Sequence, residues 1–250
     1  MDSIKKNFSL ENYEIIVADS QTEEDTELMM REEYPEIKFF PFKANVGFQE
    51  LVKKGISESQ GNFFLILNGD IIVRKDSIEK MLEFLKSHDE IGMIGPQLIN
   101  FNETLQPSCF KFYSPLTIIY RRTFLGRLSF AQKKLNEFLM KDFDHQEPKE
   151  VDWLMGSALL VKRQAVEKVG LMDSRFKMYM EDTDWCRRFW EKGYKVVYFP
   201  KAKMYHYHGR GSAGKNALLS IFSNWLTRVH IGSAVKYFLK YLGKPLPKHN

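Results

Sequence analysis

Strand-like and helix-like hydrophobic patterns alternate through the first hundred residues of this 250-residue chain. Apolar runs typical of buried strands occur at residues 13–18, 38–42, 63–67 and 91–98. Between them, residues 23–34, 48–59 and 77–87 place apolar side chains at helical spacing. This alternation predicts an α/β fold with a mostly parallel sheet, flanking helices on both faces, and strand ends that meet at one ligand-binding edge.

The composition limits the class of protein. A hydrophobic fraction of 44%, with 14% aromatic residues, excludes a disordered chain. The two cysteines, Cys109 and Cys186, are too few for a disulfide framework, which favours a reducing, cytoplasmic setting. No apolar run approaches the ~20 residues that a membrane span needs, and the N-terminus lacks the apolar stretch of a signal peptide.

Charge is distributed unevenly along the chain. No Asp or Glu follows Glu191, whereas eleven of the 37 basic residues do. Residues 1–191 therefore hold 26 basic and 32 acidic residues, a net charge of −6, although the whole chain carries +5. The basic C-terminal part predicts an anionic partner there.

The second half of the chain departs from the alternating pattern. Residues 101–148 form an aromatic and basic stretch with one expected helix at 130–140, which we interpret as an insertion beside the active edge. Residues 218–242 show apolar residues on one helical face and lysines on another. This tail (residues 213–250) predicts either an interfacial helix on anionic lipid or ordinary domain packing.

Polar residues stand where three predicted elements begin or end. Asp19 and Asp70 each follow an apolar strand, the latter within Asn68-Gly69-Asp70. Glu181 and Asp182 begin a predicted helix, and His206 ends the strand-like run at 196–205. Turn chemistry, a helix cap, dipole compensation and simple packing are the structural alternatives for these residues.

Five segments in this order resemble inverting family-2 glycosyltransferases of the GT-A fold, most closely a rhamnosyltransferase-like branch. They are YEIIVADSQTEEDT (13–26), NVGF (45–48), FLILNGD (64–70), VDWLMGSALLVKR (151–163), and FKMYMEDTDWCRR (176–188) continuing to YHYHGRGS (205–212). The resemblance implies a Rossmann-like GT-A domain over residues 1–212. Relatives begin with a further strand and helix, so we expect a shortened variant that lacks the first strand.

The resemblance implies a divalent cation, Mg²⁺ or Mn²⁺, on the diphosphate of the donor. Asp70 matches the last residue of the family's Asp-x-Asp motif, and His206 matches a histidine that completes the metal shell, with His208 as the alternative. Hard oxygen ligands and imidazole suit such ions.

The Glu181-Asp182 pair matches the acidic motif in which the second residue is the catalytic base, so Asp182 is expected to deprotonate the acceptor. The nucleotide-binding residues implied by the resemblance are Asp19, Asn45, Gly47, Asn68 and Arg210. The sugar and acceptor residues implied in the same way are Asp152, Trp153 and Gly156, although a tryptophan is as often part of a core. Lys53, where many relatives carry Asn, is a departure.

The expected function is transfer of a sugar, from dTDP-rhamnose or a UDP-sugar, to a hydroxyl of a lipid-linked or polysaccharide acceptor with inversion. Two alternatives are a non-catalytic nucleotide-sugar binding or assembly subunit, and a basic scaffold on a membrane. We expect a peripheral protein on the inner face of the plasma membrane. No nucleic-acid recognition motif accompanies the basic tail.

Overall fold

The computed structural model describes residues 1–8, 12–207 and 225–247. Strands β1 (Ile16–Ser20) and β2 (Lys38–Phe42) form a small parallel sheet of their own. The main sheet has seven strands. Its path runs β3 (Phe63–Leu67), β10 (Ala158–Lys162), β5 (Ile91–Ile99), β11 (Lys195–His206) and β4 (Ile71–Val73), with β6 (Leu105–Gln106) on β5 and β8 (Lys149–Glu150) on β11. Strands β7 (Cys109–Phe110) and β9 (Trp153–Leu154) form a third, two-stranded sheet.

The predicted alternation of strands and helices is confirmed. Helices α2 (Glu24–Glu33), α3 (Phe48–Glu58) and α4 (Ser77–Lys86) follow β1, β2 and β4, within one residue of the predicted ranges. Strand β1 begins three residues later than expected. Hydrophobic periodicity was therefore a sufficient signal for the elements themselves.

The prediction of a mostly parallel sheet is wrong, because the main sheet is mixed. Only β5 and β11 run parallel in it, whereas β10 pairs antiparallel with both β3 and β5, and β4, β6 and β8 are also antiparallel to their neighbours. Strand β4 follows β3 after residues 68–70 but pairs antiparallel with β11, at the other end of this path from β3. Strand β10 enters between β3 and β5 from a segment far along the chain, outside the alternating region.

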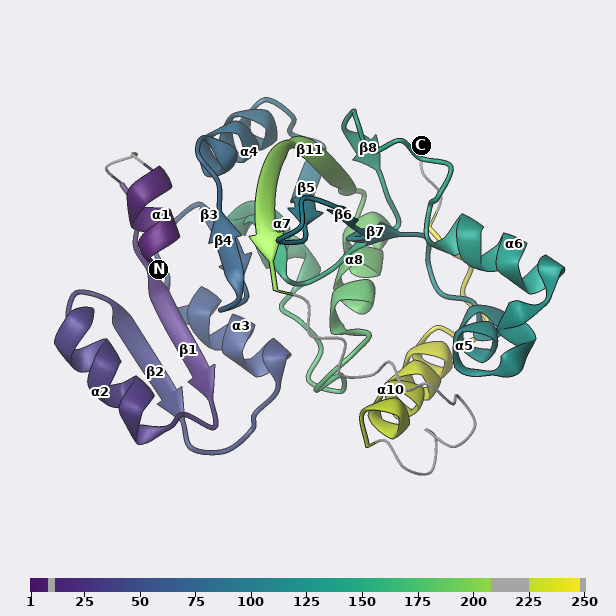
Figure 1. The fold of residues 1–250 in the computed structure, drawn as a ribbon, viewed down its shortest axis with the longest axis horizontal. Coiled ribbons are helices and arrows are strands. Elements are labelled where there is room, and N and C mark those ends of the chain that lie inside the picture. Colours follow the sequence, from purple (N-terminus) through teal and green to yellow (C-terminus); the bar gives the residue numbers. More distant parts are fainter. Residues whose placement is uncertain (9–11, 208–224, 248–250) are drawn as a thin grey trace.

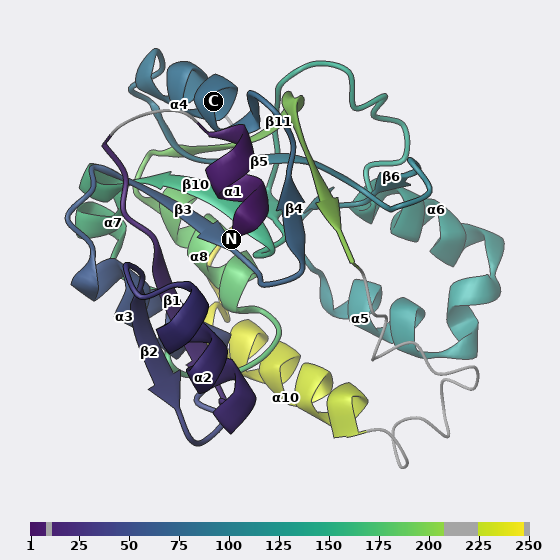
Figure 2. The ribbon, with the colours of Figure 1, turned by 60° about the vertical axis from the view of Figure 1, so that its left-hand side comes forward.

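Helices cover both faces of the main sheet, with one hydrophobic cluster on each side (Figures 1 and 2). Helix α4 and the N-terminal helix α1 (Asp2–Asn7) contribute to the cluster that contains Met81 and Leu85. Helices α3, α7 (Arg163–Val169) and α8 (Glu181–Glu191) contribute to the other, which contains Trp185 and Phe189. The sheet edge that carries the motif residues is thus set on a rigid core.

The expected insertion folds into helix α5 (Pro115–Arg122), the short 3-10 helix η1 (Phe124–Arg127) and helix α6 (Ser129–Phe138). Helix α10 (Trp225–Lys240) packs beside α5, and α5 and α6 lie at the end of the molecule opposite α2 (Figures 1 and 2). Among the helices that the structure describes, none has the length and apolar character needed to cross a membrane.

Candidate active site

Asp70 and His206 meet where β4 begins and β11 ends. Asp70 Oδ1 lies 3.4 Å from His206 Nε2, and the Tyr207 N–H donates to the Asp70 carbonyl at 3.1 Å. Asp70 is exposed, whereas His206 is 5% exposed and its Nδ1 lies 3.0 Å from Oε1 of Gln106. Burial lowers the pKa of His206, although the Asp70 carboxylate opposes the shift. The imidazole is therefore neutral at neutral pH and can offer a nitrogen lone pair.

A short series of hydrogen bonds connects this pair to the acidic start of α8. Two residues before Asp70, the Asn68 N–H donates to the Ser157 carbonyl at 3.0 Å. The neighbouring Gly156 N–H donates to Asp182 Oδ2 at 3.1 Å. Segments predicted to bind metal, sugar and acceptor, which are far apart in sequence, therefore lie together.

The two carboxyl groups at the start of α8 have different surroundings. Asp182 is partly exposed, and its Oδ1 accepts from the Thr183 N–H at 2.7 Å. Burial raises the pKa of Asp182, while the hydrogen bonds from Gly156 and Thr183 oppose the rise. Burial and the adjacent Asp182 raise the pKa of Glu181 well above its usual range, and among the described residues its Oε2 has no hydrogen-bond partner. Both carboxyl groups therefore bind protons more tightly than free acids do, and Asp182 is the partly exposed member of the pair.

The backbone directly before α8 is strained. Tyr179 and Met180 both adopt left-handed conformations, with φ of 66° and 70°. Such a conformation costs on the order of 1 kcal/mol for each non-glycine residue and persists only where the surroundings enforce it. Helix α10 supplies part of that support: Ser233 Oγ donates to the Met178 carbonyl at 2.8 Å, and the His230 ring lies 4.6 Å from the Tyr179 ring.

Three of the predicted nucleotide-binding residues, Asp19, Asn45 and Gly47, lie around the end of β1. Ser20 Oγ, next to Asp19, accepts from the Val46 N–H at 3.0 Å, and Asn45 Oδ1 accepts from the Gly47 N–H at 3.1 Å. Gly47 has φ of 88°, and a Cβ there would lie 2.7 Å from the carbonyl oxygen of Lys177. The loop at 45–47 is thereby fixed between β1 and the segment that leads to α8. The nucleotide contacts of Asp19, Asn45, Gly47 and Asn68 stay predictions.

Asp152 and Trp153 make internal contacts. Asp152 Oδ2 accepts from the Phe112 N–H at 2.6 Å, and Lys111 Nζ lies 3.4 Å from its Oδ1. Trp153 Nε1 donates to the Lys111 carbonyl at 2.8 Å, and its ring stacks 4.4 Å from that of Phe110. These contacts connect the predicted sugar and acceptor segment to the start of the insertion.

Two residues named from the sequence, Arg210 and the alternative histidine His208, lie outside the described residues.

Comparison with known families decides the class of protein. The profile described as "Glycosyl transferase family 2" matches residues 1–170. The chain belongs to this family. A curated relative of this glycosyltransferase is the N-acetylglucosaminyl-diphospho-decaprenol L-rhamnosyltransferase of Mycobacterium tuberculosis, which is 27% identical over 213 residues, or 81% of this chain and 68% of that protein.

Solved structures of other transferases share the fold. GalNAc-T7, crystallised with UDP, GalNAc and Mn²⁺, has a TM-score of 0.60 at 14% identity and covers 91% of this chain. The mannosyltransferase PcManGT from Pyrobaculum calidifontis, in complex with GDP-Man and Mn²⁺, has a TM-score of 0.54 at 14% identity and covers 98%. S. aureus TarS has a TM-score of 0.55 at 13% identity and covers 83%. These TM-scores show a common GT-A-like fold. The glycosyltransferase spans 45% of the GalNAc-T7 chain, 33% of TarS and 71% of PcManGT.

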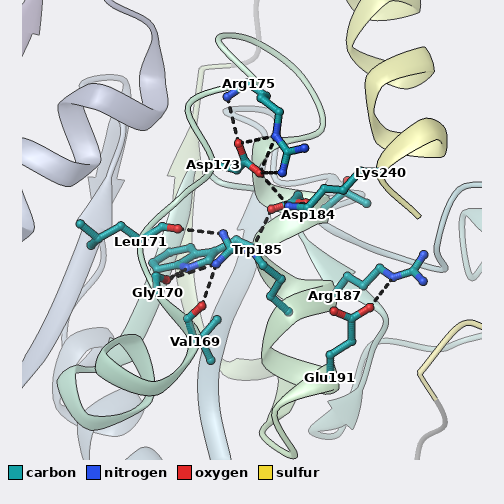
Figure 3. Close-up of polar contacts among 12 residues, drawn as sticks. Val169, Gly170, Leu171, Asp173, Arg175, Asp184, Trp185, Arg187, Glu191 and Lys240 are labelled. Carbon is teal, nitrogen blue, oxygen red and sulfur yellow. Dashed lines mark hydrogen bonds and ion pairs between the residues drawn. The ribbon is translucent and has the colours of Figure 1, made fainter. Parts of the chain in front are cut away.

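The C-terminal helix of the glycosyltransferase packs behind the candidate site. Lys240 is 14% exposed and forms ion pairs with Asp173, at 2.8 Å, and with the fully buried Asp184 (Figure 3). Lys240 is thus turned toward α8, whereas Lys236 on the same helix is exposed. Val235 and Leu242 are exposed, whereas Phe238 packs against the core. Burial of the charge on Lys240 is tolerated because two carboxylates surround it.

Sequence reasoning missed several residues that shape the site. Gln106 lies against His206. The side-chain amide of Gln49, with its nitrogen toward the loop before α8, donates to the carbonyls of Phe176 and Lys177 at 3.1 Å. Asp184 accepts from Arg188 Nε at 2.9 Å and from the Tyr241 hydroxyl at 2.9 Å. The Arg188 bond, four residues along one helix, is a spacing that could have been read from the sequence. The other contacts join segments more than 50 residues apart.

Proposed function

We propose that this glycosyltransferase moves a sugar from a nucleotide-diphosphate donor to a hydroxyl group of an acceptor, with inversion, and that Asp182 is the catalytic base. The observation that carries the proposal is the hydrogen bond from Gly156 to Asp182, one residue from the Ser157 carbonyl that accepts from Asn68. This contact supports placing the base beside the segment that leads to Asp70.

Asp182 is suited to take the proton of the acceptor hydroxyl as its oxygen attacks the anomeric carbon. Inversion requires a base on the face opposite the departing diphosphate. The two backbone N–H groups on Asp182 orient its carboxylate, and partial burial keeps its pKa above that of a free aspartate. A higher pKa makes the carboxylate a stronger base. The raised pKa of Glu181, which lies beside Asp182, favours a single negative charge on the pair.

The residues at the other end of the site suit a divalent cation. With Gln106 Oε1 as acceptor, Nδ1 of His206 carries the ring proton, and the lone pair of Nε2 faces the Asp70 carboxylate 3.4 Å away. Two such ligands, with phosphate oxygens and water completing the shell, are the usual protein share of a Mg²⁺ or Mn²⁺ site on a nucleotide. When bound, the ion would neutralise charge on the leaving diphosphate.

We further propose roles for the remaining predicted residues. Asp19, Asn45, Gly47, Asn68 and Arg210 would contact the nucleotide, and Asp152, Trp153 and Gly156 would shape the sugar and acceptor side. The name of the curated relative supports a rhamnosyl donor and a lipid-linked acceptor, which favours dTDP-rhamnose or a UDP-sugar and a polyprenol-linked or polysaccharide acceptor. Work at the cytoplasmic face of a membrane would follow from such an acceptor.

Nucleotide binding and turnover test the proposal separately. Thermal unfolding with a panel of nucleoside diphosphates should show one base-specific rise in Tm that requires manganese, and Asp70→Asn should remove it. Asp182→Asn should lower the transfer rate at least about a hundredfold, the usual minimum for loss of a general base, while leaving nucleotide affinity within twofold. Asp25→Asn, on α2, is the matched control. A fully active Asp182→Asn enzyme would exclude the base assignment, and metal-dependent binding without turnover of any donor would favour a binding subunit.

A further inference from the structure

We propose that the hairpin formed by α5, η1 and α6, residues 115–138, is a surface that docks on an anionic lipid bilayer and holds the active site against it. The sequence predicts lipid contact through the C-terminal tail. The insertion would add a second lipid-binding surface. The inference rests on the proposed function only in placing the acceptor at a membrane.

The hairpin exposes large apolar side chains at high density. Phe124 on η1 is 61% exposed and Phe130 on α6 is 60% exposed. Leu116 and Ile119, three residues apart on α5, and Leu128 are also exposed. The opposite side of the hairpin is already used for packing, by Thr117, Ala131 and Phe138. A hairpin that only filled space beside the sheet would place mostly polar residues on its outer side, so five large exposed apolar side chains within 15 residues indicate a partner.

The charge of this segment favours lipid over an apolar protein surface. Residues 115–138 contain five basic residues and a single acidic one, Glu137, although residues 1–191 as a whole carry a net charge of −6. Arg127, Lys133 and Lys134 are exposed. Apolar side chains set among lysine and arginine are typical of elements that lie in the headgroup region, where each basic residue adds attraction to anionic lipid.

Internal contacts hold the apolar residues in a fixed arrangement. The Phe130 ring packs edge-on to Tyr120 at 5.9 Å, which joins α6 to α5. The turn between them is tight, since a Cβ on Gly126 would lie 2.1 Å from the Tyr120 carbonyl oxygen, and Gln132 donates to the Gly126 carbonyl. A preformed surface binds without the cost of ordering a loop.

The hairpin is also connected to the candidate site. Ser114, the N-cap of α5, follows Tyr113, whose ring stacks 5.5 Å from Trp153 in the predicted acceptor segment. The Phe112 N–H bonds to Asp152, next to that tryptophan. On the other side, α10 packs against α5 (Figure 2). It exposes Val235, Leu239 and Lys236, and Leu242 just after it is also exposed. A bilayer at the hairpin would therefore present a lipid-linked hydroxyl close to the site.

Sedimentation with lipid vesicles, in the absence of any sugar donor, tests the inference directly. The full chain should bind vesicles that contain phosphatidylglycerol, bind phosphatidylcholine vesicles weakly, and lose affinity as salt increases. The double variant Phe124→Asp/Phe130→Asp should lower the partition coefficient at least about tenfold, because two apolar anchors are replaced by charges that lipid repels. Lys133→Glu/Lys134→Glu should weaken binding to anionic vesicles only.

A matched pair of leucines provides the control. Leu128 on the hairpin and Leu28 on α2, at the opposite end of the molecule, are each 42% exposed (Figure 1). Leu128→Asp should weaken vesicle binding and Leu28→Asp should not. Equal binding by the hairpin variants and the wild type, or no binding of the wild type to anionic vesicles, overturns the inference. The change in Tm on adding nucleotide is measured for the same proteins. This measurement distinguishes loss of lipid binding from failure of the proposed sugar transfer.

Discussion

Glu181 is harder to ionise than a free glutamate, although it begins a helix whose dipole favours negative charge. Burial removes its carboxyl group from water, and the neighbouring Asp182 adds like-charge repulsion. Both effects outweigh the helix dipole, which is worth at most ~2 kcal/mol. A pair of acids with one proton between them can supply a base of raised pKa at the surface of the site.

The raised pKa of Glu181 predicts a particular dependence of stability on pH. Because the folded state binds the proton more tightly than the unfolded state, this group lowers the free energy of unfolding as pH rises from its unfolded pKa through its folded pKa. Glu181→Gln removes that loss, so the variant should gain about 1 kcal/mol or more over the wild type at pH 8 and little at pH 4. Urea unfolding across this range measures the difference. The exposed Glu167→Gln on α7 is the control, and a pH-independent gain would contradict the assignment.

Gly47 makes a second prediction at the scale of one residue. A Cβ at this position would lie 2.7 Å from the backbone oxygen of Lys177, and its φ of 88° is unfavourable for alanine. Gly47→Ala should therefore destabilise the fold by about 1–2 kcal/mol and raise the KM for the sugar donor, since the loop before α8 must move. Gly55→Ala, in the middle of α3 with nothing within 4 Å, should be neutral or stabilise by up to ~1 kcal/mol. Thermal melts and donor titrations of both variants make the comparison.

At the scale of elements, α10 and α8 are joined by buried charge. Asp184 has no exposed surface and contacts Arg188, Lys240 and the hydroxyl of Tyr241 (Figure 3). Hydrogen bonds from Arg175 hold the pKa of Asp173 far below its usual range. Burial of the carboxyl group opposes this shift, and Lys240 adds to it. This network fixes the segment 173–180, whose end carries the strained Tyr179 and Met180. The orientation of Asp182 thus depends on a helix more than 40 residues away.

Lys240→Met tests whether the orientation of Asp182 depends on α10. Removing Lys240 leaves Asp184 and Asp173 with one cationic partner each, Arg188 and Arg175, so the cost should be at most the ~3 kcal/mol usual for breaking a buried ion pair. We expect that loss in urea unfolding, together with a lower kcat, because the loop before α8 loses a support. Lys236→Met, on the exposed side of the same helix, should change stability by no more than about 0.5 kcal/mol. Similar stability of the two variants would show that the network does not hold the loop.

The sequence predicts the helices and strands better than it predicts how the strands pair. Helices α3 and α4 and strand β3 follow from local periodicity, because each buries one repeating face. The direction of β10 does not follow from local periodicity, because the chain returns from a distant segment to place β10 between β3 and β5. The same division holds at the site: Asp70, His206 and Asp182 stand at element ends that a motif can mark, whereas Gln106 and Lys240 reach it through tertiary packing alone.

At the scale of the whole molecule, the C-terminal helix completes the main core. Ala234, Tyr237 and Tyr241 belong to the hydrophobic cluster on the α8 side of the sheet. Arg187, 3% exposed, donates to the Pro245 carbonyl at 2.9 Å and lies 3.7 Å from the centre of the Tyr241 ring. Removing this helix would uncover apolar surface and take one partner each from the buried charges of Asp184 and Arg187.

Truncation after residue 224 should therefore abolish cooperative folding. Loss of each buried aromatic side chain typically costs about 3–5 kcal/mol, so two of them approach the roughly 5–15 kcal/mol by which a domain of this kind is stable. Near-ultraviolet circular dichroism should lose its signal and calorimetry should show no sharp transition, while deletion of residues 248–250 alone leaves both unchanged. A sharp transition within a few degrees of the full chain would mean that the sheet and α8 are stable without α10, and that the Asp184 network affects only the site.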